Sequence, residues 1–372
     1  MLSVPSAVKL LLRLVSELCR SRRIVLQPYN QREKTLRFYI NILTTYYPDI
    51  DPPYDVYYQQ ILQQIELAEE LGWECFMFNE HHFLGYGGLV PNPAVLLATA
   101  AARTKKIRLG PCIAILPLRH PIHSAEDYAM VDAISGGRLE FGIGSGNTEM
   151  DYRVFGVTRE NDRERATEAL EVILKLWSNQ RASHQGKFWQ FEELTLYPRP
   201  VQQPHPPIWV AGTSAQGLGW VGRQRYHIMT VGHPHPPERV GPGVAAWKQG
   251  LMEAGIDAND RHCQFHVRTH VNENAARAKE IGMAAVTRYD EISRIGRRSL
   301  TAAPGEYDWD MMLATGRNNY GDPGQVIRGI HNAAKNYYFD TLTTTFNYGG
   351  IPHQEILTSM RLFAKEVMPA FK

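Results

Sequence analysis

From about residue 35 onward, short apolar and β-branched runs alternate with amphipathic stretches of helical length. Continuous apolar runs are typical of buried parallel strands, and an apolar repeat of three to four residues is typical of helices covering a sheet. The pattern therefore predicts strand–helix pairs and a parallel sheet. The expected strands are residues 36–43, 74–79, 107–116, 138–143, 208–211, 227–231, 264–271 and 341–346. The expected helices are residues 55–72, 92–106, 123–134, 161–177, a stretch from near Ser214, 243–254, 274–289 and 353–367.

Eight such pairs favour a single closed (β/α)8 barrel over an open doubly wound sheet, because closure leaves no sheet edge to cover. Gly72 is expected to end the first helix, and Asn92 to cap the second. Two connections exceed the usual length. We expect the proline-rich residues 178–207 to form an excursion after the fourth helix, and residues 295–320 to form a lid after the seventh.

Residues 35–372 are expected to form this one domain, preceded by a basic N-terminal extension, residues 1–34. The extension holds seven Lys and Arg against Glu17 and Glu33, whereas the whole 372-residue chain has a net charge of +2. It fits a transit-like segment, a packing helix or residues upstream of the natural start codon, and we favour the last. Its apolar stretch, residues 8–18, is too short to span a bilayer.

Composition places the chain among ordinary globular proteins, with 44% hydrophobic and 21% charged residues. Without the extension the body is close to neutral, so it has no basic surface to neutralise a phosphate backbone. Small molecules are therefore the expected partners, rather than nucleic acid or membrane. The four cysteines lack CxxC spacing, which is typical of a reducing compartment, here the cytoplasm.

Polar residues come directly after the expected strands, where active sites of (β/α)8 barrels lie. They are Asn41 and Thr44, residues 79–82, 144–147 and 212–214, Thr230, His233 and Asn347. Because a packed barrel needs no carboxylates or imidazoles at these ends, their placement indicates function.

His81 and His82 are candidates for acid–base work, because imidazole titrates near neutral pH. Adjacent side chains on an extended segment point to opposite sides, so one of the two is expected to face the cavity. The alternative for either is a hydrogen-bonded structural histidine. Glu80 fits a catalytic group and a structural hydrogen-bond acceptor equally well.

Gly212, Thr213 and Ser214 lie between an expected strand and a helix start, where backbone N–H groups and the helix dipole favour an anion such as a cofactor phosphate. From these residues alone, a plain N-cap role for Ser214 is favoured.

Three other kinds of site are not supported. The glycines of residues 142–146 are spaced too closely for a dinucleotide fingerprint, and no obvious helix follows them. Ser145 lacks the GxSxG flanks of a nucleophile elbow. The histidine pairs 120/123 and 233/235 have possible ligand spacing, but no HxH follows the first strand, so no metal is expected.

Several strings taken together resemble bacterial luciferase and its relatives, the luciferase-like flavin monooxygenases, from about Leu36 to Pro369. Their order and spacing carry the resemblance. The strings are NEHHF (79–83), NPAVLLATAAARTKKIRLG (92–110), LPLRHPIHSAED (116–127), GGRLEFGIGSG (136–146), DYRVFG (151–156), PPIWVAGTSA (206–215) and GGIPHQEILTSMRLFAKEVMP (349–369).

The resemblance implies a barrel that takes reduced FMN from a separate reductase, forms a C4a-peroxyflavin with dioxygen and passes one oxygen atom to a small, apolar organic substrate. It also implies a homodimer. By resemblance His81 is the catalytic histidine, with Glu80 and His82 as supporting neighbours. The residues that match the family's cofactor contacts are Gly212, Thr213 and Ser214 at the phosphate and Asn41 and Ala114 at the isoalloxazine ring.

The chain departs from the family's pattern after the fourth strand. Gly144 stands where luciferase has a reactive cysteine, and Ser145 where an arginine often contacts the phosphate. Arg153 is the candidate replacement, and Ser145 and Asn147 stay expected cofactor contacts. The missing cysteine fits oxygenation or bond cleavage without light emission.

Aromatic residues near the strand ends fit the wall of an apolar substrate pocket and packing under loops equally well. The pocket candidates are Tyr46, Phe83, Tyr86 and Phe346. Tyr307 and Trp309 lie in the expected lid, whose closure would exclude water.

Three alternatives remain open: deazaflavin-dependent hydride transfer on the same fold, a barrel metallohydrolase, and a non-catalytic flavin-binding partner of a related enzyme. The EHH string favours FMN over deazaflavin. The presence of His81 argues against a non-catalytic partner, which has no chemical need for it.

Overall fold

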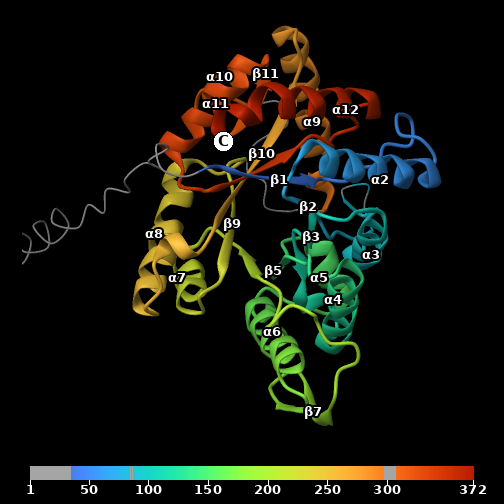
Figure 1. Ribbon diagram of the computed structural model, residues 1–372, viewed down its shortest axis with the longest axis vertical. Coiled ribbons are helices and arrows are strands. Elements are labelled where there is room, and N and C mark those ends of the chain that lie inside the picture. Colours follow the sequence, from blue (N-terminus) through green and yellow to red (C-terminus); the bar gives the residue numbers. More distant parts are fainter. Residues whose placement is uncertain (1–34, 84, 86, 297–306) are drawn as a thin grey trace, which may run out of the picture.

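A computed structural model describes residues 35–83, 85, 87–296 and 307–372, in which one parallel sheet curls into a barrel surrounded by helices (Figure 1). Along the sheet the strands follow the order β3-β2-β1-β12-β10-β9-β8-β5-β4, and β11 pairs with β10. A bridge between Leu109 and Leu139 joins β3 to the segment before β5 and brings the two ends of this path together. The prediction of a (β/α)8 barrel is confirmed. The strands are β1 (Arg37–Ile42), β2 (Cys75–Phe78), β3 (Arg108–Pro111), β4 (Ala114–Ile115), β5 (Phe141–Gly144), β8 (Ile208–Ala211), β9 (His227–Val231), β10 (Cys263–Val271), β11 (Asn318–Gly321) and β12 (Thr341–Thr345).

Helices follow the strands in the predicted alternation, and their ends form for the expected reasons. Gly72 adopts φ +89° and ends the first helix, and the Asn92 side chain accepts a hydrogen bond from the Ala94 N–H at 3.1 Å. The helices are α2 (Tyr54–Leu71), α3 (Pro93–Arg103), α4 (Pro121–Ser135), α5 (Glu149–Phe155), α6 (Asp162–Ser178), α7 (Ala215–Arg223), α8 (Pro237–Glu253), α9 (Ala275–Gly296), α10 (Trp309–Ala314), α11 (Pro323–Asn336) and α12 (His353–Leu362).

Side-chain alternation along the strands separates two apolar regions. On β1, Phe38, Ile40 and Ile42 face outward into the large core between sheet and helices. Tyr39 faces inward, and the inner cluster fills the interior of the barrel with Tyr39, Cys75, Met77, Trp209 and Met229. The barrel is thus packed internally, and any binding space lies above this layer, toward the carboxyl ends of the strands.

The third expected strand, residues 107–116, is not continuous. It divides into β3 and β4, with a cis peptide bond between Cys112 and Ile113. The stretch after Gly146, for which no helix was expected, forms the short helix α5, and α8 begins six residues earlier than predicted, at Pro237.

The two long connections contain structure of their own. In the first, β6 (Ala182–Gln185) and β7 (Gln190–Leu194) form an antiparallel hairpin, which projects at the lower end of Figure 1. In the second, residues 297–306 lie outside the described residues, and the rest contains α10 and β11. The strand–helix pair β11–α11 was not predicted.

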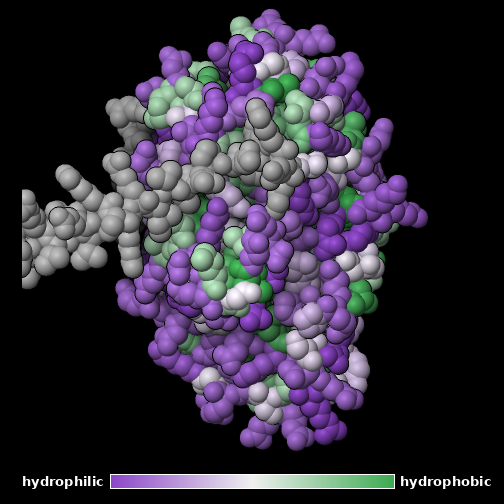
Figure 2. Space-filling view, turned by 60° about the vertical axis from the view of Figure 1, so that its left-hand side comes forward, coloured by the Kyte–Doolittle hydropathy of each residue, from purple (hydrophilic) through white to green (hydrophobic). Residues whose placement is uncertain are grey.

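The surface fits the composition: on the face shown in Figure 2, small apolar patches interrupt a mainly hydrophilic surface. The helices in the described part of the chain include none that is both long and apolar enough to cross a bilayer. The predictions for residues 1–34 lie outside the described residues.

Candidate active site at the carboxyl ends of the strands

The mouth of the barrel is lined by polar groups that the described chain leaves unsatisfied. Asn41 lies near the end of β1 and Asn79 directly after β2, and the Oδ1 atom of each has no hydrogen-bond partner among the described residues. Asn41 is buried and follows Tyr39 on the inward-facing side of β1. Buried polar atoms are normally paired, so these two indicate a place where a polar ligand edge completes the bonding.

Glu80 connects β2 to β4. Its Oε2 atom accepts a hydrogen bond from the backbone N–H of Ile115 at 3.0 Å, and its Oε1 atom lies 3.3 Å from Nε2 of His82. The carboxylate is fully buried, so both contacts form away from water. Glu80 therefore has the structural role that the sequence left open, and it fixes the segment after the Cys112–Ile113 peptide.

His81 and His82 have different neighbours, as expected for adjacent extended residues. His82 lies against Glu80 and packs on Phe155 with ring centres 4.9 Å apart. His81, with 8% of its surface exposed, packs its ring against the backbone of Gly87. Gly87 adopts φ +71°, and a Cβ atom there would overlap the His81 side chain.

The loop after His82 is attached to the end of β1. The Thr44 hydroxyl donates to the carbonyl of Gly87 at 3.2 Å, and the Tyr46 N–H donates to the carbonyl of Gly85 at 2.8 Å. The position of His81 thus depends on this loop as well as on β2.

Asp151 was not singled out from the sequence, although it begins the DYRVFG string. It lies on α5, only 1% exposed, and the Thr148 side chain is a hydrogen-bonding neighbour of its carboxylate. Burial raises the pKa of Asp151 to about 6, against the opposing effect of the His82 charge. A second titratable group thus acts electrostatically on the histidine pair.

The expected phosphate-binding turn lies at the start of α7. Ser214 is the N-cap, and its Oγ accepts a hydrogen bond from the Gly217 N–H at 3.2 Å, so the N-cap interpretation is confirmed. Gly212 and Thr213 are half-buried and Ser214 is exposed, which leaves the turn accessible to an anion. The cofactor contact itself remains a prediction.

The turn after β5 is held by Tyr152, whose hydroxyl lies 2.8 Å from the carbonyl oxygen of Ser145 and 3.0 Å from the Asp162 carboxylate. The Arg159 side chain donates to the carbonyl of Asn147 at 2.9 Å. Arg153 is exposed on α5 and borders an open cavity of about 280 Å³.

Gly144 and Ala114 are buried on neighbouring strands, and β4 pairs with β5 through Ala114–Ile143 and Ile115–Gly144. A side chain at Gly144 would overlap the end of the Ile113 side chain. Ile113 therefore occupies the space beside Gly144, next to the inner cluster.

The four pocket candidates have different surroundings. Phe346 is fully buried, with its ring centre 5.8 Å from that of Trp73 and 5.6 Å from that of Phe363, so the structure places it in the outer core. Its assignment to the pocket is wrong, because Phe346 faces the helices. Phe83 is 55% exposed and stacks on Phe155, whereas Tyr46 packs on Tyr54 at 4.6 Å. Tyr86 lies outside the described residues.

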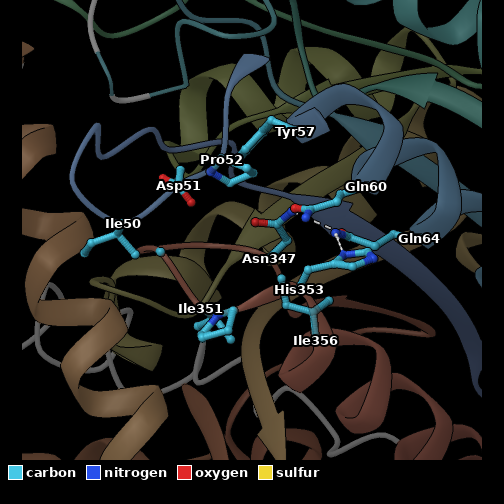
Figure 3. Close-up of a pocket in the computed structure, with 12 residues that line it drawn as sticks. Ile50, Asp51, Pro52, Tyr57, Gln60, Gln64, Asn347, Ile351, His353 and Ile356 are labelled. Atoms are coloured by element: carbon cyan, nitrogen blue, oxygen red, sulfur yellow. Dashed lines mark hydrogen bonds between the residues drawn. The ribbon is translucent and has the colours of Figure 1, made fainter. Parts of the chain in front are cut away.

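A separate polar cavity of about 300 Å³ lies between the starts of α2 and α12 (Figure 3). In it Gln64 donates to Nδ1 of His353 at 3.2 Å and accepts from the Asn347 amide at 3.1 Å. None of the predicted catalytic or cofactor residues lines this cavity, so it is distinct from the candidate site.

The metallohydrolase alternative requires a group of metal ligands. Within residues 35–83, 87–296 and 307–372, no three His, Cys, Asp or Glu side chains are grouped as a metal site requires.

Comparison with known proteins places this geometry in a family. Residues 37–336 match the family described as luciferase-like monooxygenase. A flavin-dependent trigonelline monooxygenase, oxygenase component, from Acinetobacter baylyi is 37% identical over 156 residues, covering 41% of this chain and 43% of that protein. An alkanal monooxygenase alpha chain from the Kryptophanaron alfredi symbiont is 26% identical over 357 residues, covering 89% of this chain and 98% of that protein. The chain spans about half the length of several curated relatives that it matches.

Among solved structures, the monooxygenase RslO1 from Streptomyces bottropensis superposes with a TM-score of 0.84 at 27% identity, covering 91% of this chain and all of that one. An F420-dependent secondary alcohol dehydrogenase superposes with a TM-score of 0.70 at 19% identity, covering 91% and 99%, which shows a shared fold alone. With the family matched over most of its length and the barrel site in place, this chain belongs to the luciferase-like monooxygenases.

Proposed function

We propose that the protein is the oxygenase component of a two-component flavin monooxygenase, which uses reduced FMN and dioxygen to oxygenate a small organic substrate. The observation that carries the proposal is the buried Glu80–His81–His82 string at the barrel mouth, tied through Glu80 to Ile115. Reduced FMN, when bound, supplies two electrons to dioxygen.

The residues present fit FMN at three places. The open turn at Gly212–Ser214 lies at a helix N-terminus, which suits a phosphate. The surface formed by Ile113, Ala114 and Gly144 is apolar and suits a flat ring. The unpartnered Oδ1 atoms of Asn41 and Asn79 suit the N–H edge of that ring.

The proton chemistry is assigned to the buried groups beside the ring site. We assign His81 as the group that holds or moves a proton during oxygen transfer, with His82 and Glu80 keeping its segment in place. Asp151, whose pKa burial raises to about 6, contributes a second exchangeable proton near neutral pH. Burial of these groups also excludes water from the place where the proton would move.

The partners follow from the same proposal. A separate reductase supplies the reduced FMN, in keeping with the trigonelline enzyme's description as an oxygenase component. We also propose a homodimer and a cytoplasmic location, both carried over from the sequence analysis.

The competing function on this fold is hydride transfer with a deazaflavin. The F420-dependent alcohol dehydrogenase that shares the fold is the reason to test it. The two functions differ in their use of oxygen. Product formation under strictly anaerobic conditions with a deazaflavin would support hydride transfer and overturn the oxygenase.

The first test mixes the full-length protein and reduced FMN with oxygenated buffer in a stopped-flow spectrometer. The expected result is a transient near-ultraviolet band that outlives the band seen with free reduced FMN, together with a slower release of hydrogen peroxide. Oxidation at the rate of free FMN, with no transient band, would contradict the proposal.

A further inference from the structure

We propose that Arg268, at the barrel mouth on β10, binds a carboxylate group of the substrate. This inference rests on the proposed oxygenase function and narrows it to substrates that carry a carboxylate group. Nothing in the resemblance or in the comparisons assigns Arg268 a role.

Strand register places Arg268 above the candidate flavin surface. Gln264, His266 and Arg268 are alternate residues of β10 and share one side of it. Gln264 Nε2 contacts Met77 Sδ of the inner cluster at 3.2 Å, and His266 Nε2 lies 3.7 Å from Sγ of Cys112. Arg268 is therefore the next inward residue, about 7 Å further toward the mouth.

The Arg268 guanidinium is buried, with 9% of the residue exposed, yet several of its N–H groups lack a hydrogen-bond acceptor. Its Nε and Nη1 atoms have no hydrogen-bond partner among the described residues, and Nη2 lies 3.8 Å from Oδ1 of Asp290, beyond hydrogen-bond distance. Its flat face rests on the Tyr289 ring, with Cζ 4.6 Å from the ring centre. Besides this contact with Tyr289, the guanidinium keeps hydrogen-bond donors for another group.

Asp290 does not complete this bonding, because it is engaged elsewhere. Its Oδ2 atom lies 3.3 Å from Nε2 of His233 and accepts a hydrogen bond from the Tyr307 hydroxyl. Burial raises the pKa of Asp290, but these two hydrogen bonds and the Arg268 charge outweigh it, so that pKa is lowered. The Asp290 carboxylate therefore offsets part of the positive charge of Arg268 but does not accept hydrogen bonds from its guanidinium.

The charges around this place do not cancel. Burial, aided by the Arg268 charge, lowers the pKa of His233 to about 4, so His233 is neutral at neutral pH. Arg317, also buried, lies with its backbone beside Gly232 and directs its guanidinium to Thr315 and Met311 rather than to a carboxylate. Arg268 and Arg317 therefore outnumber the carboxylate of Asp290, and Arg288 and Arg294 also act on tyrosines of this cluster. A ligand carboxylate would reduce this surplus of positive charge.

Neighbouring donors complete a site for such a group. The side chains of Tyr320 and Tyr348 are buried and interact with each other, and both are under the electrostatic influence of Arg268. A pair of hydroxyls uses one proton between them and leaves the other to donate to a ligand. A carboxylate offers lone pairs for several donors at once, and a guanidinium fork binds it through two parallel hydrogen bonds.

The competing interpretation is purely structural: Arg268 and Asp290 would only hold α9 against the barrel. That role would be served by a close ion pair, whereas the observed separation is 3.8 Å and two guanidinium nitrogens stay unpaired.

The test measures binding of small carboxylic acids and their primary amides, benzoate with benzamide and hexanoate with hexanamide, to the full-length protein with oxidised FMN. Wild type is expected to bind each acid roughly tenfold to a hundredfold more tightly than its amide, the range of a charge-assisted hydrogen bond. Arg268→Gln should abolish this preference, and Arg268→Lys should keep a reduced one, since lysine retains the charge but loses the fork. Arg103→Gln, which breaks an ion pair with Glu66 on the outer helices, should leave the preference unchanged.

Two results would overturn the proposal: amides that bind wild type as tightly as acids, and an acid preference that survives Arg268→Gln. If Arg268→Gln does not fold, Tyr348→Phe and the charge-neutral pair Arg268→Gln/Asp290→Asn replace it. Tyr348→Phe should weaken acid binding several-fold, and the double variant should abolish the preference; unchanged affinities in both would count against the site. Because binding is measured without turnover, a failed oxygen reaction would reject the oxygenase function and leave this result standing.

Discussion

Oε2 of Glu80 lies 3.0 Å from the backbone nitrogen of Ile115, so a carboxylate at the end of one strand fixes the backbone of another. The two residues are 35 positions apart in sequence, and this bond joins the histidine string to the surface proposed for the flavin ring. Several expected outcomes depend on this arrangement.

Replacing Glu80 tests the connection directly. Glu80→Ala leaves the Ile115 N–H buried without a partner, and we expect it to lower the free energy of unfolding by about 1–3 kcal/mol. Glu80→Gln keeps an acceptor oxygen and should lose less. Denaturant unfolding of both variants checks this; equal stability of wild type and Glu80→Ala would show that the contact contributes nothing.

Replacing His81 tests the proton role. His81→Ala should retain FMN binding, because the phosphate turn lies elsewhere, and should lower product formation by roughly a hundredfold, the scale of a lost general acid or base. The measurement is a flavin titration paired with a turnover assay. Unchanged turnover with FMN bound would remove His81 from the chemistry.

Substitutions at Gly87 and Gly72 distinguish the effect of backbone strain from the effect of displacing His81. Gly87→Ala and Gly72→Ala both place a Cβ atom at positive φ, which should lower the free energy of unfolding by about 1–2 kcal/mol each. Only at Gly87 would the new atom meet His81, whereas Gly72 faces open space. We therefore expect Gly87→Ala to lower both the turnover rate and the free energy of unfolding. Gly72→Ala should lower the free energy of unfolding and leave the turnover rate unchanged. Equal turnover in the two variants would contradict this role of Gly87.

Asp151 should make stability depend on pH in a defined direction. Its pKa in the folded protein is about 6, above the ordinary 3.8, so the folded state holds the proton more tightly than the unfolded state. The stability contributed by the protonated form is full below about pH 4 and is lost as the pH rises through 6. Asp151→Asn should therefore be more stable than wild type at pH 8, by about 1–3 kcal/mol, and similar at pH 4. A difference that is the same at both pH values would contradict this assignment.

Phe346 separates packing from substrate contact. Because it is fully buried against Trp73 and Phe363, Phe346→Ala should lower the free energy of unfolding by about 3–5 kcal/mol. The milder Phe346→Leu should fold and keep its KM for substrate. A raised KM in Phe346→Leu with unchanged stability would return the residue to the pocket.

The barrel could be predicted from sequence because its signals are local. Buried parallel strands are apolar runs, and helix ends such as Gly72 and Asn92 carry their own chemistry. The strand β11 was missed because its sequence is Asn-Asn-Tyr-Gly, although all four residues are buried. The helix after it had a readable signal, a capping box between Asp322 and Gln325 with Pro323 in the first turn.

The candidate site was predictable only in part. The NEHHF string located His81, but the partners of Glu80 and the burial of Asp151 depend on contacts between distant segments. Phe346 shows the opposite limit: an aromatic residue after a strand has the same sequence appearance whether it faces the mouth or the helices. Arg268 gave no signal, because its unsatisfied donors become visible only when β10, α9 and β11 are assembled.

The space beside Gly144 makes the side chain that fits at 144 depend on the residue at 113. Ile113 fills the place that a side chain at 144 would take, so a cysteine there, as luciferase has, would need Ile113 to turn aside or become smaller. A thiol at 144 and the Ile113 side chain in its present position therefore compete for the same volume. A cysteine at 144 therefore requires either another conformation of the Ile113 side chain or a smaller residue at 113, and Gly144→Cys alone would first test whether the side chain fits.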